Sequence, residues 1–162
     1  MSISIDNFIQ KLIIFMKKCT LVLLAFFMCI ELQAQNWNDN ISSAIKEASQ
    51  NNKKILLFFT VEDQCENCTK LEQNIFKSDD FIAFANENYN LVKIKFDYNS
   101  ASNLSEEEIK QNLLIVEKYN KDGFFPLVVL LNKEAKKLGN IGVYKNETPS
   151  QYIALLHSIE KI

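Results

Sequence analysis

The sequence predicts an α/β fold, with a central mixed sheet of about four strands between helices in three α/β/α layers. Segments with apolar residues at helical spacing alternate along the chain with segments that favour strands. The run Ile55–Phe59 is apolar without alternation, as in a strand that is covered on both faces of a sheet. Two cysteines, Cys65 and Cys68, follow this run where a helix is expected to begin.

The first predicted elements are a helix and the buried strand. From Trp37 to Asn51 the apolar side chains fall on one helical face, so we expect a helix there. The strand occupies residues 53–60, and the next helix begins near Cys65. Residues 78–88 again show helical spacing, and the side chain of Ser78 is suited to cap this helix.

The middle of the chain predicts one strand and one helix. Residues 89–97 alternate between apolar and polar side chains, which favours a strand with one covered face. The polar stretch 99–104 is expected to be a loop. Ser105 and Glu108 then have the spacing of a capping box, and they open a helix whose apolar face includes Leu113.

The C-terminal part predicts a β-hairpin and a last helix. Residues 127–131 are apolar throughout, and residues 138–143 contain two glycines that favour an edge strand. The last helix starts at Thr148 and Pro149, because proline is well tolerated at the first helical position. With right-handed crossovers we expect the first three strands to lie parallel, and the hairpin to add one antiparallel edge.

The cysteine pair has a spacing typical of a redox centre. A thiol at a helix N-terminus meets unpaired backbone N–H groups and the positive end of the helix dipole, and both favour thiolate over thiol. We therefore expect Cys65 to act as the nucleophile and Cys68 to resolve the mixed disulfide that Cys65 forms. The alternative is a static structural bridge, although a loop this short constrains little of the unfolded chain.

The N-terminal residues 1–35 predict an export signal. Lys17 and Lys18 form a basic start, an apolar stretch follows, and Ala34 is a small residue at the expected cleavage site. The expected location of the mature protein is the periplasm. An uncleaved membrane anchor is the alternative, although charged residues interrupt the run of roughly 20 apolar residues that a span needs.

The remaining chain, residues 36–162, is expected to form a single domain, since it contains no repeat or linker. Met16 is the expected true start, because the lysine pair follows it at once. Cys19 and Cys29 would leave with the signal segment, so the redox pair alone would remain in the mature protein.

Charge and composition argue against several other functions. The net charge is −2 and all 18 basic residues are lysine, so no nucleic acid is expected as a partner. His157 is the sole histidine and nothing places it beside Cys65, which argues against a Cys-His hydrolase. Two thiolates do not fill a tetrahedral zinc site, so no metal is expected. Thiol-disulfide exchange between the two cysteines needs no cofactor, so none is expected. Metal transfer through the cysteine pair remains an alternative.

The residues around the cysteines resemble the thioredoxin superfamily. Residues 65–72 read Cys-x-x-Cys-x-x-Leu-Glu, and the segment 76–81 and the downstream Pro126 extend the match, which runs from about residue 53 to residue 144. The pattern is most similar to exported thioredoxin-like domains such as the C-terminal domain of the transmembrane thiol:disulfide interchange protein. This resemblance implies a thioredoxin-like fold and a cis peptide bond before Pro126. It also implies that Phe125 and Pro126 contact client proteins.

Two positions depart from the family pattern. A tryptophan usually precedes the first cysteine, and here Gln64 takes its place and is assigned to the same client site. Phe59 stands where the family has a buried aspartate, so the usual proton acceptor is missing. Glu72 matches an acidic position of the transporter-like domains, which implies a relay for the proton of Cys68. A solvated surface glutamate is the alternative, and Lys93 is either near the active site or simply exposed.

We therefore expect an exported thiol-disulfide oxidoreductase that reduces disulfides of client proteins. Negative charges at 62, 63 and 66 oppose the thiolate, and no basic residue lies between the cysteines, so a strongly oxidising site is not expected. The resemblance implies a membrane protein as electron donor, and we expect a monomer. The alternatives are a disulfide oxidase or isomerase with the same thiols, and a non-catalytic binding module. Phe124 and Phe125 are expected mostly in the core, with Phe125 as a candidate lining of the client groove.

Overall fold

The computed structural model describes residues 10, 16–18, 35–61, 65–96 and 105–160. The chain divides into two units, Met1–Ala34 and Gln35–Ile162, and the second contains the fold described below. Most of the predicted export signal lies outside the described residues. Within those residues, no helix is both long and apolar enough to cross a bilayer.

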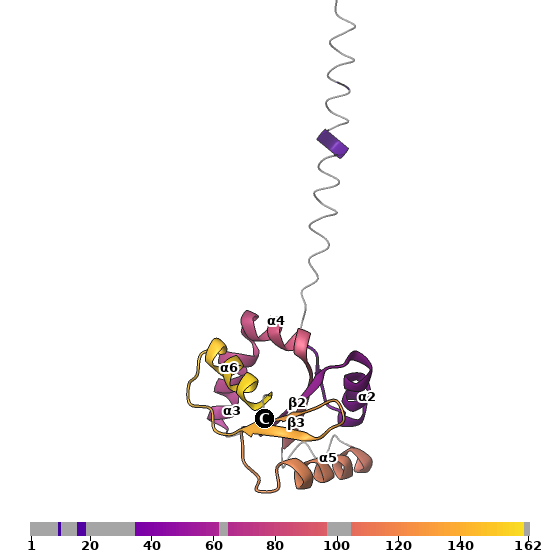
Figure 1. Cartoon of the computed structure of the whole chain (residues 1–162), viewed down its shortest axis with the longest axis vertical. Coiled ribbons are helices and arrows are strands. Elements are labelled where there is room, and N and C mark those ends of the chain that lie inside the picture. Colours follow the sequence, from indigo (N-terminus) through magenta and orange to yellow (C-terminus); the bar gives the residue numbers. More distant parts are fainter. Residues whose placement is uncertain (1–9, 11–15, 19–34, 62–64, 97–104, 161–162) are drawn as a thin grey trace, which may run out of the picture. The chain divides into compact units, whose positions relative to one another are not determined.

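The described part of the second unit contains a five-stranded sheet with the strand order β1-β3-β2-β4-β5, seen edge-on beside its helices in Figure 1. β2 lies in the middle, pairs in parallel with β3 and pairs in antiparallel fashion with β4. β5 is an edge strand that forms a hairpin with β4, as predicted. The strands are β1 (Trp37–Asn38), β2 (Lys54–Val61), β3 (Tyr89–Phe96), β4 (Leu127–Leu131) and β5 (Lys137–Ile141).

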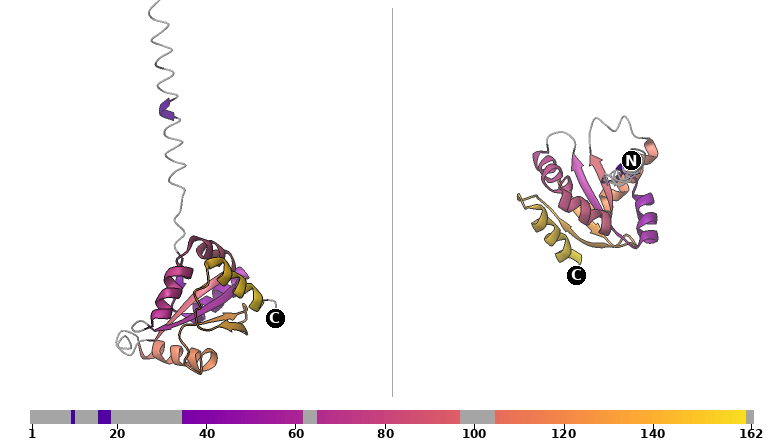
Figure 2. Two further views of the ribbon diagram at one scale, coloured as in Figure 1. Left: turned by 90° about the vertical axis from the view of Figure 1, so that its left-hand side faces the viewer. Right: turned by 90° about the horizontal axis from the view of Figure 1, so that it is seen from above.

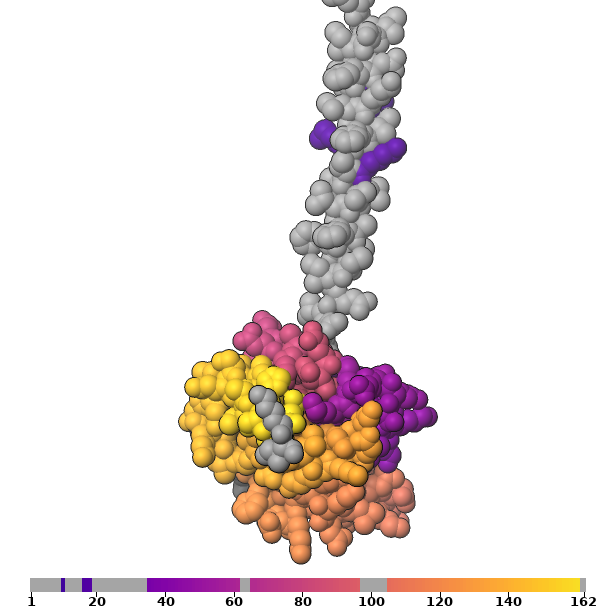
Figure 3. Space-filling model, viewed as in Figure 1, coloured from indigo at the N-terminus to yellow at the C-terminus, as the bar shows by residue number. Residues whose placement is uncertain are grey.

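Helices cover both faces of this sheet, which confirms the predicted three layers (Figure 2). One face carries α2 (Ile41–Asn51) and α5 (Glu106–Tyr119). The other face carries the remaining helices, and the space-filling view in Figure 3 shows α6 in yellow beside the orange hairpin, with α4 above them. These helices are α3 (Glu66–Leu71), the π-helical turn η1 (Glu72–Phe76), α4 (Asp79–Asn88) and α6 (Pro149–Glu160).

The central strand β2 is covered on both faces, as its apolar run predicts. Leu56 and Phe58 belong to the core between the sheet and the helices α3, η1, α4 and α6. Leu57 and Phe59 point to the opposite core, beneath α2 and α5. Because successive side chains of a strand alternate between the two faces, β2 is anchored by both cores at once. This anchoring fixes the end of the strand from which the cysteine segment departs.

The predicted helix starts are largely confirmed. The Ser78 hydroxyl accepts a hydrogen bond from the Phe81 N–H at 3.3 Å, and Ser105 and Glu108 form the complete capping box. The first helix, however, begins four residues later than predicted. The side-chain oxygen of Asn40 accepts from the N–H groups of Ser42 and Ser43 and so caps α2 at Ile41.

Residues 37–38, predicted as helix, form the fifth strand β1 instead. They pair in parallel with β3, and the ring of Trp37 packs against Phe58 and Phe76 at centroid distances of 5.9 and 5.2 Å. The apolar spacing that suggests a longer helix therefore arises from a tryptophan that joins the core from a strand.

The predicted parallel direction of the third strand is wrong, since β4 runs antiparallel to β2. The pattern of apolar residues in a strand carries no information about direction, and the crossover rule applies only when the two strands are parallel. Two side chains predicted to be buried are also exposed, Leu113 at 55% and Phe124 at 61%. In α5 the buried positions are Ile115 and Tyr119 instead.

Candidate active site

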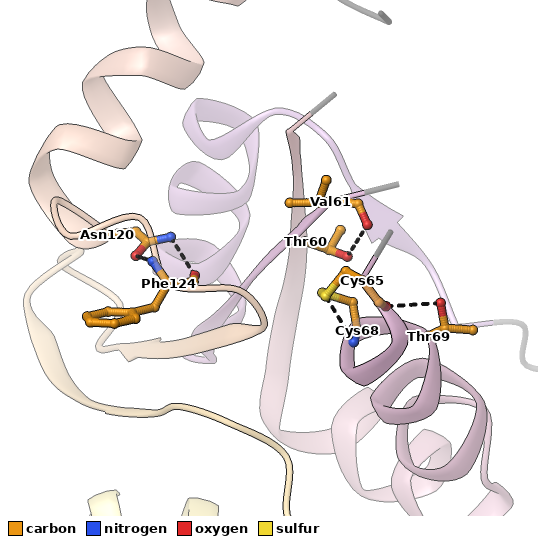
Figure 4. The surroundings of a disulfide bond; sticks show 7 residues. All are labelled: Thr60, Val61, Cys65, Cys68, Thr69, Asn120 and Phe124. Carbon is orange, nitrogen blue, oxygen red and sulfur yellow. Dashed lines mark hydrogen bonds between the residues drawn. A yellow bond between two sulfur atoms is a disulfide. The ribbon is translucent and has the colours of Figure 1, made fainter. Parts of the chain in front are cut away.

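Cys65 and Cys68 form a disulfide at the N-terminus of α3, just after β2 (Figure 4). Their Cα atoms are 5.2 Å apart. Cys65 is the N-cap residue of α3, and its sulfur accepts a hydrogen bond from the Cys68 N–H at 3.2 Å. Cys65 is partly exposed, whereas Cys68 is only 2% exposed. A visiting molecule can therefore reach the first sulfur far more easily than the second.

The charge next to the disulfide is partly neutralised within α3. Lys70 lies 2.7 Å from the carboxylate of Glu66, one helical turn away on the exposed surface. The hydrogen bond and the positive charge of Lys70 lower the pKa of Glu66 below its usual value. Glu66 is therefore ionised at neutral pH but paired, so its charge opposes a Cys65 thiolate less than an isolated carboxylate would. The other two acidic positions, 62 and 63, lie outside the described residues.

The peptide bond between Phe125 and Pro126 is cis, as the resemblance implies. Leu127, the next residue, pairs with Phe59 near the C-terminal end of β2. Pro126 therefore lies at the end of the sheet from which the cysteine segment departs. Pro126 is buried, and Phe125 is partly exposed and packs against Phe96 at a centroid distance of 5.7 Å. Their contact with clients stays a prediction, and Gln64, assigned to the same site, lies outside the described residues.

Glu72 follows directly after α3 and forms an ion pair with Lys93 of β3. The side chains are 27% and 23% exposed, so both are half-buried rather than freely solvated. The backbone N–H of Glu72 donates to the carbonyl of Cys68, and the Lys93 amine lies 5.8 Å from the centre of the Phe58 ring. The structure thus brings Glu72 and Lys93 together near the second cysteine.

The structure also shows a feature that the sequence analysis missed. Asn120, at the end of α5, is 3% exposed, and its side chain makes two hydrogen bonds to the backbone of Phe124. The only sequence signal for this arrangement is an asparagine at a helix end with Asp-Gly two residues further on, a pattern typical of a turn. Nothing in that pattern specifies which backbone groups the asparagine binds.

His157 lies in α6 and takes part in a separate contact. Its ring packs against Phe84 at a centroid distance of 5.0 Å, and its Nδ1 lies 3.3 Å from the carboxylate of Glu160. His157 is therefore a residue on the exposed side of the last helix, and its contacts within the described residues are with Phe84 and Glu160. Among the described residues, no three His, Cys, Asp or Glu side chains gather into a group that could hold a metal ion.

Comparison with known proteins gives one curated relative and several similar structures. Disulfide bond reductase DsbH of Chlamydia pneumoniae is 30% identical over 104 residues, which cover 64% of this chain and 61% of that protein. The alignment thus spans less than two thirds of the relative's length. A solved DsbH oxidoreductase has a TM-score of 0.69 at 27% identity, and the match covers 78% of this chain and 85% of that chain.

Two more distant structures share the fold alone. A thioredoxin from Thermus thermophilus has a TM-score of 0.58 at 9% identity, over 78% of this chain and 88% of that one. The oxidised C-terminal domain of Neisseria meningitidis DsbD has a TM-score of 0.50 at 12% identity, over 73% and 91%. The family model of the thioredoxin-like domain matches residues 41–158. The chain therefore belongs to the thioredoxin-like domain family, as its cysteine motif, cis-proline and sheet also indicate.

Proposed function

We propose that this protein is a thiol-disulfide oxidoreductase that reduces disulfides of client proteins. The observation that carries the proposal is the unequal exposure of the two bonded sulfurs at the N-terminus of α3, with Cys65 partly exposed and Cys68 buried. This inequality suits a pair in which one thiol attacks and the other resolves. The name of the curated relative, a disulfide bond reductase, supports the same chemistry.

The proposed reaction starts from the reduced pair. The Cys65 thiolate attacks one sulfur of a client disulfide, so that a mixed disulfide forms and the other client sulfur leaves as a thiolate that takes up a proton. Cys68 then loses its proton and attacks the sulfur of Cys65, which releases the second client thiol. Two electrons pass to the client, and Cys65 and Cys68 end as the disulfide seen in Figure 4. Glu72 is the proposed acceptor of the proton from Cys68.

The direction of reduction is supported by the surroundings of the attacking sulfur. Among the described residues, the backbone N–H of Cys68 donates to the sulfur of Cys65, and the residues between the cysteines are Glu66 and Asn67. A strong oxidant stabilises its reduced thiolate, for example with basic neighbours, and neither residue between the cysteines is basic. We therefore expect a reduction potential nearer to about −270 mV than to about −120 mV. A potential at the upper value would assign the protein to disulfide formation instead.

Export to the periplasm and a membrane electron donor belong to the same proposal. Both rest on the pattern of residues 1–35 and on the resemblance to exported reductases. N-terminal sequencing of the protein recovered from envelope fractions tests the first point, with a mature start near Gln35 expected. An intact N-terminus on a membrane-bound protein would favour the uncleaved anchor.

A trapping experiment tests the oxidoreductase function. The Cys68→Ser variant should accumulate mixed disulfides between Cys65 and client proteins, because the resolving thiol is absent. The Cys65→Ser variant is the matched control and should trap far fewer partners, since its remaining thiol is buried. If Cys68→Ser traps no partner and the wild-type protein reduces no disulfide in an insulin assay, the protein is a binding module with a static bridge.

A further inference from the structure

The loop before the cis-proline holds an exposed aromatic ring on a fixed backbone. The side chain of Phe124 is 61% exposed, although its neighbours Phe125 and Pro126 are partly or fully buried. A single exposed apolar side chain is common on protein surfaces and by itself indicates nothing. Phe124 differs from an ordinary exposed side chain because hydrogen bonds hold its backbone in place.

Asn120 fixes Phe124 by hydrogen bonds in both directions. Its side-chain NH2 donates to the carbonyl of Phe124 at 3.0 Å, and the N–H of Phe124 donates to its side-chain oxygen at 3.0 Å. Gly123, at a φ of +67°, also donates its N–H to the carbonyl of Asn120 at 3.0 Å. The backbone polar groups of Phe124 are therefore already paired, and its exposed ring is what remains to contact a partner.

The loop lies at the end of the sheet where the disulfide is found. Leu127 pairs with Phe59, two residues before the end of β2, and the cysteine segment leaves from that end. Figure 4 draws Phe124 among the residues that surround the disulfide, with its ring directed away from the sulfur atoms. An extended client chain advances about 3.3 Å per residue, so a side chain a few residues from the client cysteine can reach such a ring.

We propose that Phe124 selects clients by binding an apolar side chain a few residues from their reacting cysteine, and that Asn120 is the residue that positions it. The inference rests on the proposed oxidoreductase function and adds a substrate preference to it. A rigid aromatic side chain loses little conformational freedom on binding, and for this reason such residues are effective contact points in interfaces. The occupant is an extended apolar segment, because the ring offers no charge and the N–H and carbonyl of Phe124 are already bonded to Asn120.

The test uses a series of disulfide-bonded peptides. In one set a phenylalanine is placed in turn at each position within four residues of the cysteine, and in the matched set a serine takes the same place. The ratio of kcat/KM for the two members of each pair measures the preference independently of the amount of active protein. For the wild-type protein we expect a ratio of about five at the best position, as one aromatic contact provides.

In the Phe124→Ala variant this ratio should fall to about one, chiefly through a higher KM for the phenylalanine peptide. Leu155→Ala, which removes another exposed apolar side chain from α6, is the control and should keep the wild-type ratio. A wild-type ratio near one at every position, or an unchanged ratio in Phe124→Ala, would overturn the inference. If the wild-type protein reduces neither peptide set, the proposed function fails and the inference with it.

Asn120 is tested by two substitutions. Asn120→Ala removes both hydrogen bonds to Phe124 and should lower the ratio towards one, whereas Asn120→Asp keeps the acceptor for the Phe124 N–H and should give an intermediate ratio. A merely structural role would reduce kcat/KM for both peptides alike and leave their ratio unchanged. That outcome would remove Asn120 from the proposal while Phe124 is judged by its own variant.

Discussion

Glu72 and Lys93 form an ion pair that connects the turn η1, which directly follows α3, to strand β3. The pair is half-buried, and the backbone N–H of Glu72 is bonded to the carbonyl of Cys68. A carboxylate in this place is held near the resolving cysteine by both its backbone and its side chain. This arrangement supports the proposal that Glu72 takes the proton from Cys68.

We predict that Glu72→Gln slows the resolving step, because an amide cannot accept the proton. The rate at which the mixed disulfide at Cys65 decays should fall by about tenfold or more, at the lower edge of what a positioned base contributes. Rapid-quench trapping of the intermediate measures this rate. Glu66→Gln, an exposed glutamate of α3, is the control and should leave it within twofold. Equal decay rates in both variants would show that water serves as the acceptor.

The contact between α6 and β5 predicts a strong effect at one glycine. A Cβ atom at Gly139 would lie 2.5 Å from Cγ2 of Ile159, so the Ile159 side chain, its helix or the strand would have to shift. Gly139→Ala should lower the free energy of unfolding by about 1–3 kcal/mol, as overpacking does. Urea unfolding followed by the fluorescence of Trp37, the sole tryptophan, measures this change. Gly142→Ala meets no atom within 4 Å and should change stability by less than about 0.5 kcal/mol.

Two buried tyrosines should respond in opposite ways to loss of the hydroxyl. The hydroxyl of Tyr152 makes no hydrogen bond with the described residues, so Tyr152→Phe should leave the free energy of unfolding unchanged or raise it by about 1 kcal/mol. The hydroxyl of Tyr144 donates to the Glu147 carbonyl at 3.0 Å and accepts from Asn74. Tyr144→Phe should therefore cost about 1 kcal/mol. Thermal unfolding of both variants measures these changes in stability. A larger loss of stability in Tyr152→Phe than in Tyr144→Phe would contradict the prediction.

The lowered pKa of Glu160 predicts that the protein loses stability in acid. Its burial raises its pKa, but hydrogen bonds from Tyr89, Lys54 and His157 outweigh this effect, so the pKa lies below the usual 4.5. The stabilisation from the ionised carboxylate is therefore complete above that usual value, and it is lost as the pH falls through the lower pKa of the folded protein. Between pH 7 and pH 3 the wild-type protein should lose about 1 kcal/mol more than Glu160→Gln in urea unfolding. Parallel pH profiles for the two proteins would contradict this reading.

The environment of Tyr89 predicts a loss of stability at alkaline pH. Burial and the hydrogen bond to Glu160 raise the pKa of Tyr89 far above its usual value of 10. Its stabilisation is complete below pH 10 and is lost as the pH rises beyond it, because the unfolded chain then releases a proton that the folded protein keeps. Tyr89→Phe should flatten the decline of stability above pH 10, as measured by urea unfolding. A decline as steep as that of the wild-type protein would show that other groups cause it.

Contacts between residues close in sequence are enough to specify the elements that build the site. The side chains of the apolar run Ile55–Phe59 leave water only if both faces of the strand are covered. In the structure, both faces are covered by helices. The capping residues Ser78 and Ser105 mark helix starts because their hydroxyls meet unpaired N–H groups close by in sequence. The position of Cys65 at the start of a helix is likewise predicted from sequence spacing alone. These features depend on contacts within a few residues, so a single sequence is enough to predict them.

The direction of β4, and with it the composition of the site, depends on contacts between distant parts of the chain. Had β4 run parallel to β2, its first residue and Pro126 would lie at the opposite end of the sheet from Cys65. The antiparallel pairing of Leu127 with Phe59 brings them to the same end, together with Asn120 and the exposed ring of Phe124. The period of apolar residues is the same for both directions of a strand. The choice therefore rests on long-range packing and pairing, which residue spacing does not encode.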